Sequence, residues 1–161
     1  AFRQLHIQRE SGSGLQLVLN ILNRRALPVV ERACEAGVGV IARMALQFGL
    51  LTGAMRPGKV FTEDDHRAFR LTDEIIGRTL GLLDPFWKEL AEAGITPTQA
   101  ALSYAAAVPG VSTVIPGIRT PEQAEQNAGA VVEGSDRVRA LVEAMPAGAC
   151  EEIVALMQER G

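Results

Sequence analysis

Aromatic residues and histidines are scarce in this chain of 161 residues. Phenylalanine, tryptophan and tyrosine together make up 4% of it, and histidine occurs twice. Apolar residues still reach 47%, which is enough for one hydrophobic core, so leucine, valine, isoleucine and alanine must fill it. We therefore expect residues 1–161 to form a single domain.

Cysteine is limited to Cys34 and Cys150, which lie far apart in the sequence. They form no Cys-x-x-Cys pair and no cluster with histidine at metal-ligand spacing, so we predict no metal site. Both fall in apolar helical surroundings, and we expect both thiols to be buried packing residues. A disulfide between them is the alternative, but free thiols in a reduced cytoplasmic protein are the simpler expectation.

Charge of one sign does not dominate, because 16 basic residues face 19 acidic ones and the net charge is -3. The basic stripe typical of nucleic-acid binders is missing. No apolar run approaches the length of a membrane span, and the first ten residues lack the apolar centre of a signal peptide. We expect a cytoplasmic protein that binds neither nucleic acid nor membrane.

Short strands alternating with helices are the main pattern of the chain. The apolar, β-branched runs at 38–42 and 111–115 are typical of buried parallel strands. Helices are expected at 26–36, 71–93 with a break near Pro85, 96–107, 120 onward, 135 onward and 146–160. This alternation predicts a parallel sheet with helical crossovers.

The first twenty residues depart from this alternation. Two alternating or apolar runs, 2–8 and 15–20, flank a Ser-Gly-Ser-Gly turn. They predict a β-hairpin, so that residues 1–14 add an extra strand and turn.

With three or four strands, the chain is too short to close a β/α barrel, which needs about eight strands. The predicted fold is therefore an α/β, TIM-type half barrel with an N-terminal hairpin. Because open sheet edges are normally paired or covered, we expect a homodimer or a missing N-terminal barrel half to complete it.

Three segments carry a family resemblance. The first is Gln-Leu-Val-Leu-Asn at 16–20, followed by Ile-Leu-Asn-Arg-Arg, and the second is Gly-Val-Gly-Val-Ile-Ala at 37–42, leading to Gly-Leu-Leu-Thr-Gly at 49–53. The third is Val-Ile-Pro-Gly-Ile-Arg-Thr-Pro-Glu-Gln at 114–123. They resemble the C-terminal half of the aldo-keto reductases, NADP(H)-dependent oxidoreductases with a (β/α)8 barrel. The resemblance spans most of 15–145. The family's relay of Asp, Tyr, Lys and His lies in the other half, and no such set can be assigned in this sequence.

The resemblance implies an NADP(H) site with Gln16 at the nicotinamide amide. It further implies 2'-phosphate and adenine contacts from Gly117, Arg119, Thr120, Gln123 and Asn127. Two departures put this site in doubt, because Leu19 stands where the family has a stacking tyrosine and Met44 replaces a hydroxyl at the pyrophosphate. A helix start beside an arginine attracts anions, but Thr120 and Gln123 can equally serve only to begin a helix.

Arg43 and Gln47 follow a predicted strand at its carboxyl end, where barrel enzymes carry their active sites. Together with Leu19 and Met44 they form the predicted substrate pocket, in which Arg43 favours an anionic ligand. A salt bridge at a dimer contact is the alternative for Arg43. Asp65 and His66 form a speculative catalytic pair, with His66 as general base, unless they are only part of a polar surface loop.

Three functions stay open. The favoured one is a truncated aldo-keto reductase-like protein repurposed for non-redox chemistry on a small metabolite, such as a cyclisation or isomerisation, or for ligand binding. The second is an NADP(H)-dependent oxidoreductase fragment or split subunit that needs the N-terminal half. The third is a non-catalytic interaction protein. If the chain is an enzyme, we expect it not to act as an aldo-keto reductase alone.

Overall fold

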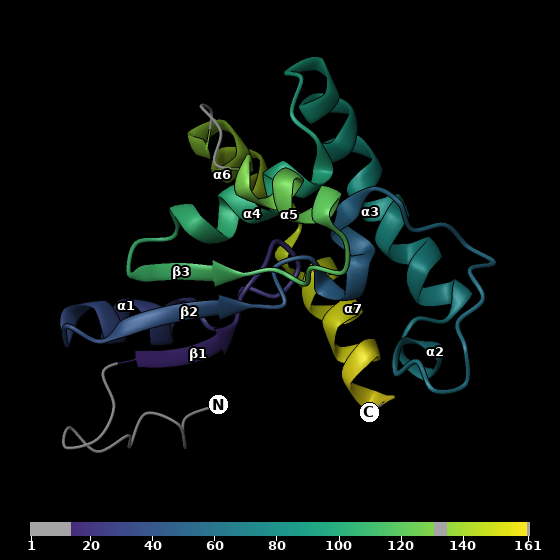
Figure 1. Ribbon diagram of the computed structural model, residues 1–161, viewed down its shortest axis with the longest axis horizontal. Helices are drawn as coiled ribbons and strands as arrows, with labels where there is room; N and C mark the ends of the chain where they lie inside the picture. Colours follow the sequence, from purple (N-terminus) through teal and green to yellow (C-terminus); the bar gives the residue numbers. More distant parts are fainter. Residues whose placement is uncertain (1–13, 131–134, 161) are drawn as a thin grey trace.

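Three parallel strands form the sheet in the computed structural model, which describes residues 14–130 and 135–160 (Figure 1). The strands are β1 (Gly14–Val18), β2 (Gly39–Arg43) and β3 (Val111–Ile115), hydrogen-bonded in the order β1-β2-β3. All three point the same way, so their carboxyl ends meet at one edge of the sheet. The partner strand of the expected hairpin, 2–8, lies outside the described residues.

Helices connect and flank these strands. They are α1 (Leu27–Glu35), the 3-10 segment η2 (Gln47–Thr52), α2 (Arg67–Arg70), α3 (Asp73–Glu92), α4 (Pro97–Ala107), α5 (Pro121–Ala128), α6 (Ser135–Ala144) and α7 (Ala147–Glu159). In Figure 1, α4, α5 and α6 lie above β3, whereas α7 lies near the carboxyl ends of the strands. This βαβ pattern confirms the predicted α/β class with parallel strands.

The expected break near Pro85 is wrong, because α3 runs without interruption from Asp73 to Glu92. A proline inside a helix removes one backbone hydrogen bond, here the one to the carbonyl of Gly81. The buried side chains of α3 lie on both sides of the proline, so packing against the core holds both halves of the helix in line. They are Ile75, Ile76, Thr79, Leu83, Phe86 and Leu90.

Two helix starts follow their sequence signals. The Thr96 hydroxyl accepts the Gln99 N–H and the Gln99 side chain accepts the Thr96 N–H, which makes a complete capping box at α4. At α5 the Thr120 hydroxyl accepts the Gln123 N–H. No capping box is completed at α5, because the Gln123 side-chain oxygen accepts the N–H of Arg119, at 2.8 Å.

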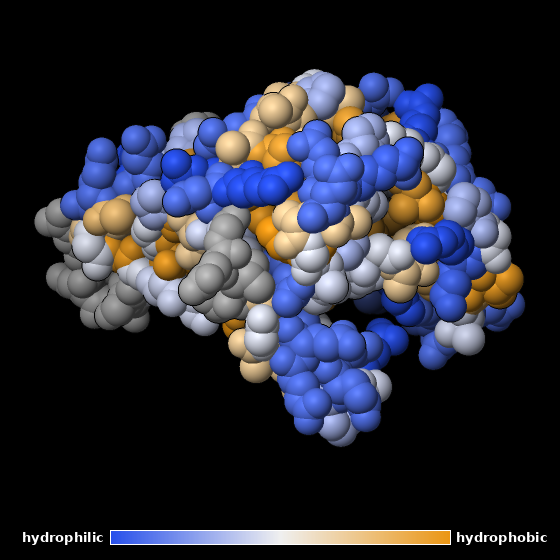
Figure 2. All heavy atoms as spheres, turned by 90° about the horizontal axis from the view of Figure 1, so that it is seen from above, coloured by the Kyte–Doolittle hydropathy of each residue, from blue (hydrophilic) through white to orange (hydrophobic). Residues whose placement is uncertain are grey.

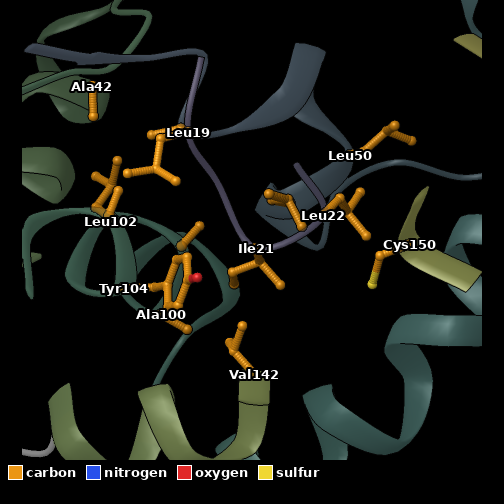
Figure 3. Close-up of a cluster of buried hydrophobic side chains, with 14 of the residues drawn as sticks. Leu19, Ile21, Leu22, Ala42, Leu50, Ala100, Leu102, Tyr104, Val142 and Cys150 are labelled. Atoms are coloured by element: carbon orange, nitrogen blue, oxygen red, sulfur yellow. The ribbon is translucent and has the colours of Figure 1, made fainter. Parts of the chain in front are cut away.

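The core lies between one face of the sheet and the surrounding helices. Val40 and Ala42 of β2 are fully buried, as is the apolar segment that follows β1. Figure 3 shows side chains from distant parts of the sequence pointing toward one another in this core, among them Leu19, Ile21, Leu102 and Tyr104. Cys150 is buried here as expected, whereas the expectation is wrong for Cys34, which is exposed.

The described residues leave the other face of the sheet largely uncovered. This open face is formed by Gln16, Val18, Ile41, Arg43, Thr113 and Ile115, which are neighbours in the strand register. Gln16, Arg43 and Thr113 are exposed, and Ile115 keeps 45% of its surface accessible. The expectation that β3 is buried is therefore wrong for this face. An unclosed sheet with helices on one side confirms the predicted half barrel.

The helical side has a different surface. Seen from above, hydrophilic residues surround smaller groups of hydrophobic ones (Figure 2). This is the ordinary outer layer of a β/α fold, in which helices turn a polar side outward. No helix of the described ranges is long and apolar enough to cross a membrane.

Candidate ligand pocket

A cavity of about 390 Å³ lies at the carboxyl ends of β1 and β2. We call it the carboxyl-end pocket. It combines the ends of two strands, the turn after β2, and α7, which arrives from the far end of the chain. Its lining residues are Val18, Asn23, Arg43, Met44, Gln47, Phe48, Arg70, Val154, Met157 and Gln158. Within the described chain this lining contains two arginines and no carboxylate.

Three of the four residues predicted for a substrate pocket meet here: Arg43, Met44 and Gln47. Leu19 does not line the cavity, because its side chain is fully buried in the core. Phe48 and the α7 residues also line the pocket but were not predicted from the sequence. Phe48 follows directly on the predicted set, whereas nothing in the sequence of α7 indicates which strand ends it approaches.

Arg43 is the exposed cation of the pocket. Its side chain makes no hydrogen bond or ion pair with any other described residue. A guanidinium group carries a permanent charge and offers paired donors that match a carboxylate or phosphate.

The second arginine belongs to an aromatic cluster. Arg70 lies with its guanidinium 4.4 Å from the centre of the Phe69 ring and 5.8 Å from that of Phe48, and it donates to the backbone oxygen of His66 at 3.3 Å. The rings of Phe48 and His66 meet edge to face at 5.4 Å. The loop that contains α2 is thus joined to the pocket wall through Phe48.

The turn after β2 has an unusual backbone. Met44, Gln47 and Phe48 have φ values of 58°, 42° and 56°, in the left-handed region that side chains other than glycine rarely adopt. Such a residue costs about 1–3 kcal/mol, and groups of them are typical of functional sites. All three line the pocket.

Asn20 joins this turn to the end of β1. It is fully buried, and its side-chain NH₂ donates to the backbone oxygen of Met44 at 3.0 Å and to the side-chain oxygen of Gln47 at 2.7 Å. Its own side-chain oxygen accepts the N–H groups of Leu22 and Asn23. Every polar atom of this side chain is therefore satisfied, and Asn20 was not among the predicted site residues.

The predicted catalytic pair is not assembled as expected. The carboxylate of Asp65 accepts hydrogen bonds from Arg67, at 2.9 and 3.0 Å from Nε and 2.5 Å from Nη2. This bonding holds the pKa of the Asp65 carboxyl far below its usual range. No hydrogen bond joins Asp65 to His66 among the described contacts, so Asp65 is not placed to orient the imidazole.

The predicted adenosine contacts gather at the start of α5. Arg119, Thr120 and Gln123 are exposed there, and the Asn127 side chain donates to the Gly117 oxygen at 3.5 Å. The carboxylate of Glu122 shares this place. Hydrogen bonds from the Thr120 hydroxyl and from its own backbone N–H lower the pKa of Glu122, so that it carries a negative charge at the helix start. A phosphate bound there would be repelled by that charge.

These residues do not fit NADP(H) as a complete set. Gln16 is exposed on the open face, and Arg119 is available for an anion. However, Leu19 is buried in the core, and Met44 offers a thioether in place of a hydroxyl. Gln123 already binds the backbone of Arg119, and Glu122 opposes a phosphate.

A half barrel with a pocket at the carboxyl ends of its strands defines a member of the β/α-barrel class. The comparisons with known proteins name the family. The model of the aldo/keto reductase family matches residues 13–145, so the chain belongs to this family. The match confirms the resemblance in the sequence over nearly the same range. It ends before α7, which supplies part of the pocket wall.

Solved structures agree on the fold. The chain is similar to the glycerol dehydrogenase from Gluconobacter oxydans, with a TM-score of 0.69 and 22% identity, over 98% of this chain and 46% of that one. It is also similar to the holo form of an aldo-keto reductase from Bacillus halodurans, with a TM-score of 0.65 and 19% identity, over 91% of this chain and 47% of that one. The chain thus spans about half the length of these structures. Curated protein sequences gave no match.

The described residues also lack an obvious metal centre, since no three His, Cys, Asp or Glu side chains among them come together in a way that could hold an ion.

Proposed function

We propose that this chain binds an anionic small molecule in the carboxyl-end pocket, as a truncated relative of the aldo-keto reductases that has been repurposed. A non-redox reaction on that ligand, such as a cyclisation or an isomerisation, needs no hydride donor and so agrees with the incomplete NADP(H) site. The observation that carries the proposal is the exposed guanidinium of Arg43 in a pocket whose described lining contains no carboxylate.

The remaining lining supports a small metabolite as the ligand. Val18, Val154 and Met157 offer apolar surface to a carbon skeleton, while the side-chain amides of Asn23 and Gln158 offer donors and acceptors. A volume of about 390 Å³ falls within the usual range of small-molecule sites, roughly 300–1,000 Å³. Arg43 would bind the acidic group, because charge-assisted hydrogen bonds to guanidinium are the strongest contacts available there.

Calorimetric titration with inorganic pyrophosphate and with citrate tests the proposal. We expect saturable binding of at least one of them, and a loss of about tenfold or more in affinity in Arg43→Ala, since a hydrogen bond to a charged group contributes about 1.5–3 kcal/mol. Arg32→Ala removes an equally exposed arginine from α1 and serves as the matched control. Equal affinities of the two variants would show that Arg43 is not the anion site.

The second candidate is a fragment or split subunit of an NADP(H)-dependent oxidoreductase, which needs the N-terminal half of the barrel. Family membership and the coverage of about half of each similar structure favour it. Titration with NADPH separates the two candidates. Tight binding that Arg119→Ala abolishes and Arg43→Ala leaves unchanged would support the oxidoreductase and oppose our proposal.

A partner on the open face would bury apolar side chains such as Ile115, which is favourable in water. We propose that a second copy of this chain or an N-terminal barrel half covers it. A purely non-catalytic interaction protein would use the same face and leave the pocket without a ligand. Sedimentation of the purified chain distinguishes a homodimer from a monomer.

A further inference from the structure

The turn after β2 is held in a conformation that its own residues disfavour. Met44, Gln47 and Phe48 all have positive φ, yet none of them is glycine. The backbone bonds within the turn are few: the Gln47 N–H donates to the Met44 oxygen, and the Gly49 and Leu51 N–H groups donate to that of Leu46. Something outside the turn must therefore stabilise it.

Asn20 supplies that outside support. Its side-chain NH₂ reaches across to the Met44 oxygen and to the Gln47 side chain, 24 and 27 residues further along the chain. Both acceptors belong to residues with positive φ. The same Gln47 side chain also contacts the Met157 sulfur, at 3.7 Å, so the support continues from β1 through the turn to α7.

We infer that Asn20 is a positioning residue, which holds the Met44–Phe48 turn in its strained form and thereby shapes the wall of the carboxyl-end pocket. This inference rests on the proposed function for its effect on a ligand, but not for its effect on the turn. Asn20 itself does not line the pocket, so it acts only through the residues that it binds.

The two halves of the Asn20 amide have separate tasks, which makes the inference testable. The oxygen serves the local bend after β1 by accepting from Leu22 and Asn23, whereas only the NH₂ group reaches the turn. Asn20→Asp keeps the oxygen and the side-chain size, and replaces the donor with an acceptor. The new carboxylate oxygen would then face the Met44 oxygen and the Gln47 oxygen. Because all three are acceptors, they repel one another, and the turn is destabilised.

Hydrogen exchange of the backbone amides is the first measurement. We expect Asn20→Asp to lower the protection of Gln47, Gly49 and Leu51 by about tenfold or more beyond any loss in the rest of the core, in line with a hydrogen-bond loss of this kind. Ser103→Ala is the matched control, because Ser103 is also buried and its hydroxyl donates to the Ala130 oxygen and not to the turn. A loss spread evenly over the chain in both variants would overturn the inference.

A second variant guards against a mutant that fails to fold. Asn20→Ser keeps a short acceptor for Leu22 and Asn23 but cannot reach the turn, and the same selective loss of protection is expected. Adding Met44→Gly should restore part of it, because glycine adopts positive φ without strain and the turn then needs less support. Strictly additive effects of the two changes would contradict the inference.

Ligand affinity separates this inference from the proposed function. If pyrophosphate and citrate bind, Asn20→Asp should weaken them by about tenfold or more, and Ser103→Ala by less than about twofold. If neither ligand binds the unchanged protein, the proposed function fails, while the exchange data still decide whether Asn20 holds the turn. Unchanged affinity together with a loosened turn would contradict the positioning of the pocket wall.

Discussion

Single residues show how burial sets chemistry in this chain, and the two thiols are the simplest case. Cys150 is 1% exposed, and burial raises the pKa of its thiol, an effect that the neighbouring Arg24 only partly offsets. Cys34 lies on α1 and is exposed. Because the thiolate is the reactive form, the two should differ strongly toward a thiol reagent.

We predict that at pH 8 a disulfide reagent such as Ellman's modifies one thiol rapidly and the second only after unfolding. Cys34→Ser should abolish the rapid phase, and Cys150→Ser should leave it intact. Absorbance stopped-flow on the folded protein measures this. Rapid release from the Cys34→Ser variant would mean that the core around Cys150 is open.

At the same scale, the sequence could predict only part of the pocket. Arg43 and Gln47 were found because they follow a predicted strand at its carboxyl end, and Met44 was found through the family resemblance. Asn20 and Phe48 were missed, since their roles depend on a turn with positive φ that no residue type in it indicates. Asn20 is 24 and 27 residues away from its partners in the sequence, and only folding brings them together.

Secondary-structure elements followed the sequence closely wherever packing agreed with local preference. The apolar runs at β2 and β3 and the helix start at Thr96 were recognised from pattern alone. Pro85 failed as a helix breaker because tertiary packing of α3 outweighs one lost hydrogen bond. The exposure of β3 could not be read from its apolar sequence, since what covers a strand depends on neighbouring chain segments.

The approach of α1 to β3 gives a prediction at the scale of elements. Gly110 precedes β3 with φ +93°, and a Cβ there would lie 2.8 Å from the Cβ of Cys34 and 3.2 Å from the Val30 oxygen. Gly110→Ala should therefore reduce the free energy of unfolding by more than about 1 kcal/mol, because it adds backbone strain and a clash.

Gly81→Ala is the matched control for this change. Gly81 lies inside α3 with nothing within 4 Å of the added Cβ, and alanine should stabilise the helix by about 1 kcal/mol. Urea unfolding of both variants measures the two effects. Equal stabilities would contradict the close contact between α1 and β3.

The whole molecule is best understood as part of a family barrel. Its strands run in parallel and in sequence order, its family model spans 13–145, and it covers about half of each similar structure. The open face follows from the unclosed sheet, because strands that would be surrounded in a closed barrel are accessible here. The carboxyl-end pocket lies where closed barrels also carry their sites. The sequence predicted this architecture from strand count and resemblance, but not the participation of α7.

The two candidate functions place the ligand at different positions on this half barrel: in the carboxyl-end pocket, or at the family's cofactor site at the start of α5. The test is a titration of the isotope-labelled protein with inorganic pyrophosphate and with citrate, followed by the backbone amide resonances. The account predicts saturable shifts concentrated at Arg43 to Phe48 and in the facing part of α7. Shifts confined to residues 117–123 at the start of α5 would contradict it, as would the absence of shifts with both pyrophosphate and citrate.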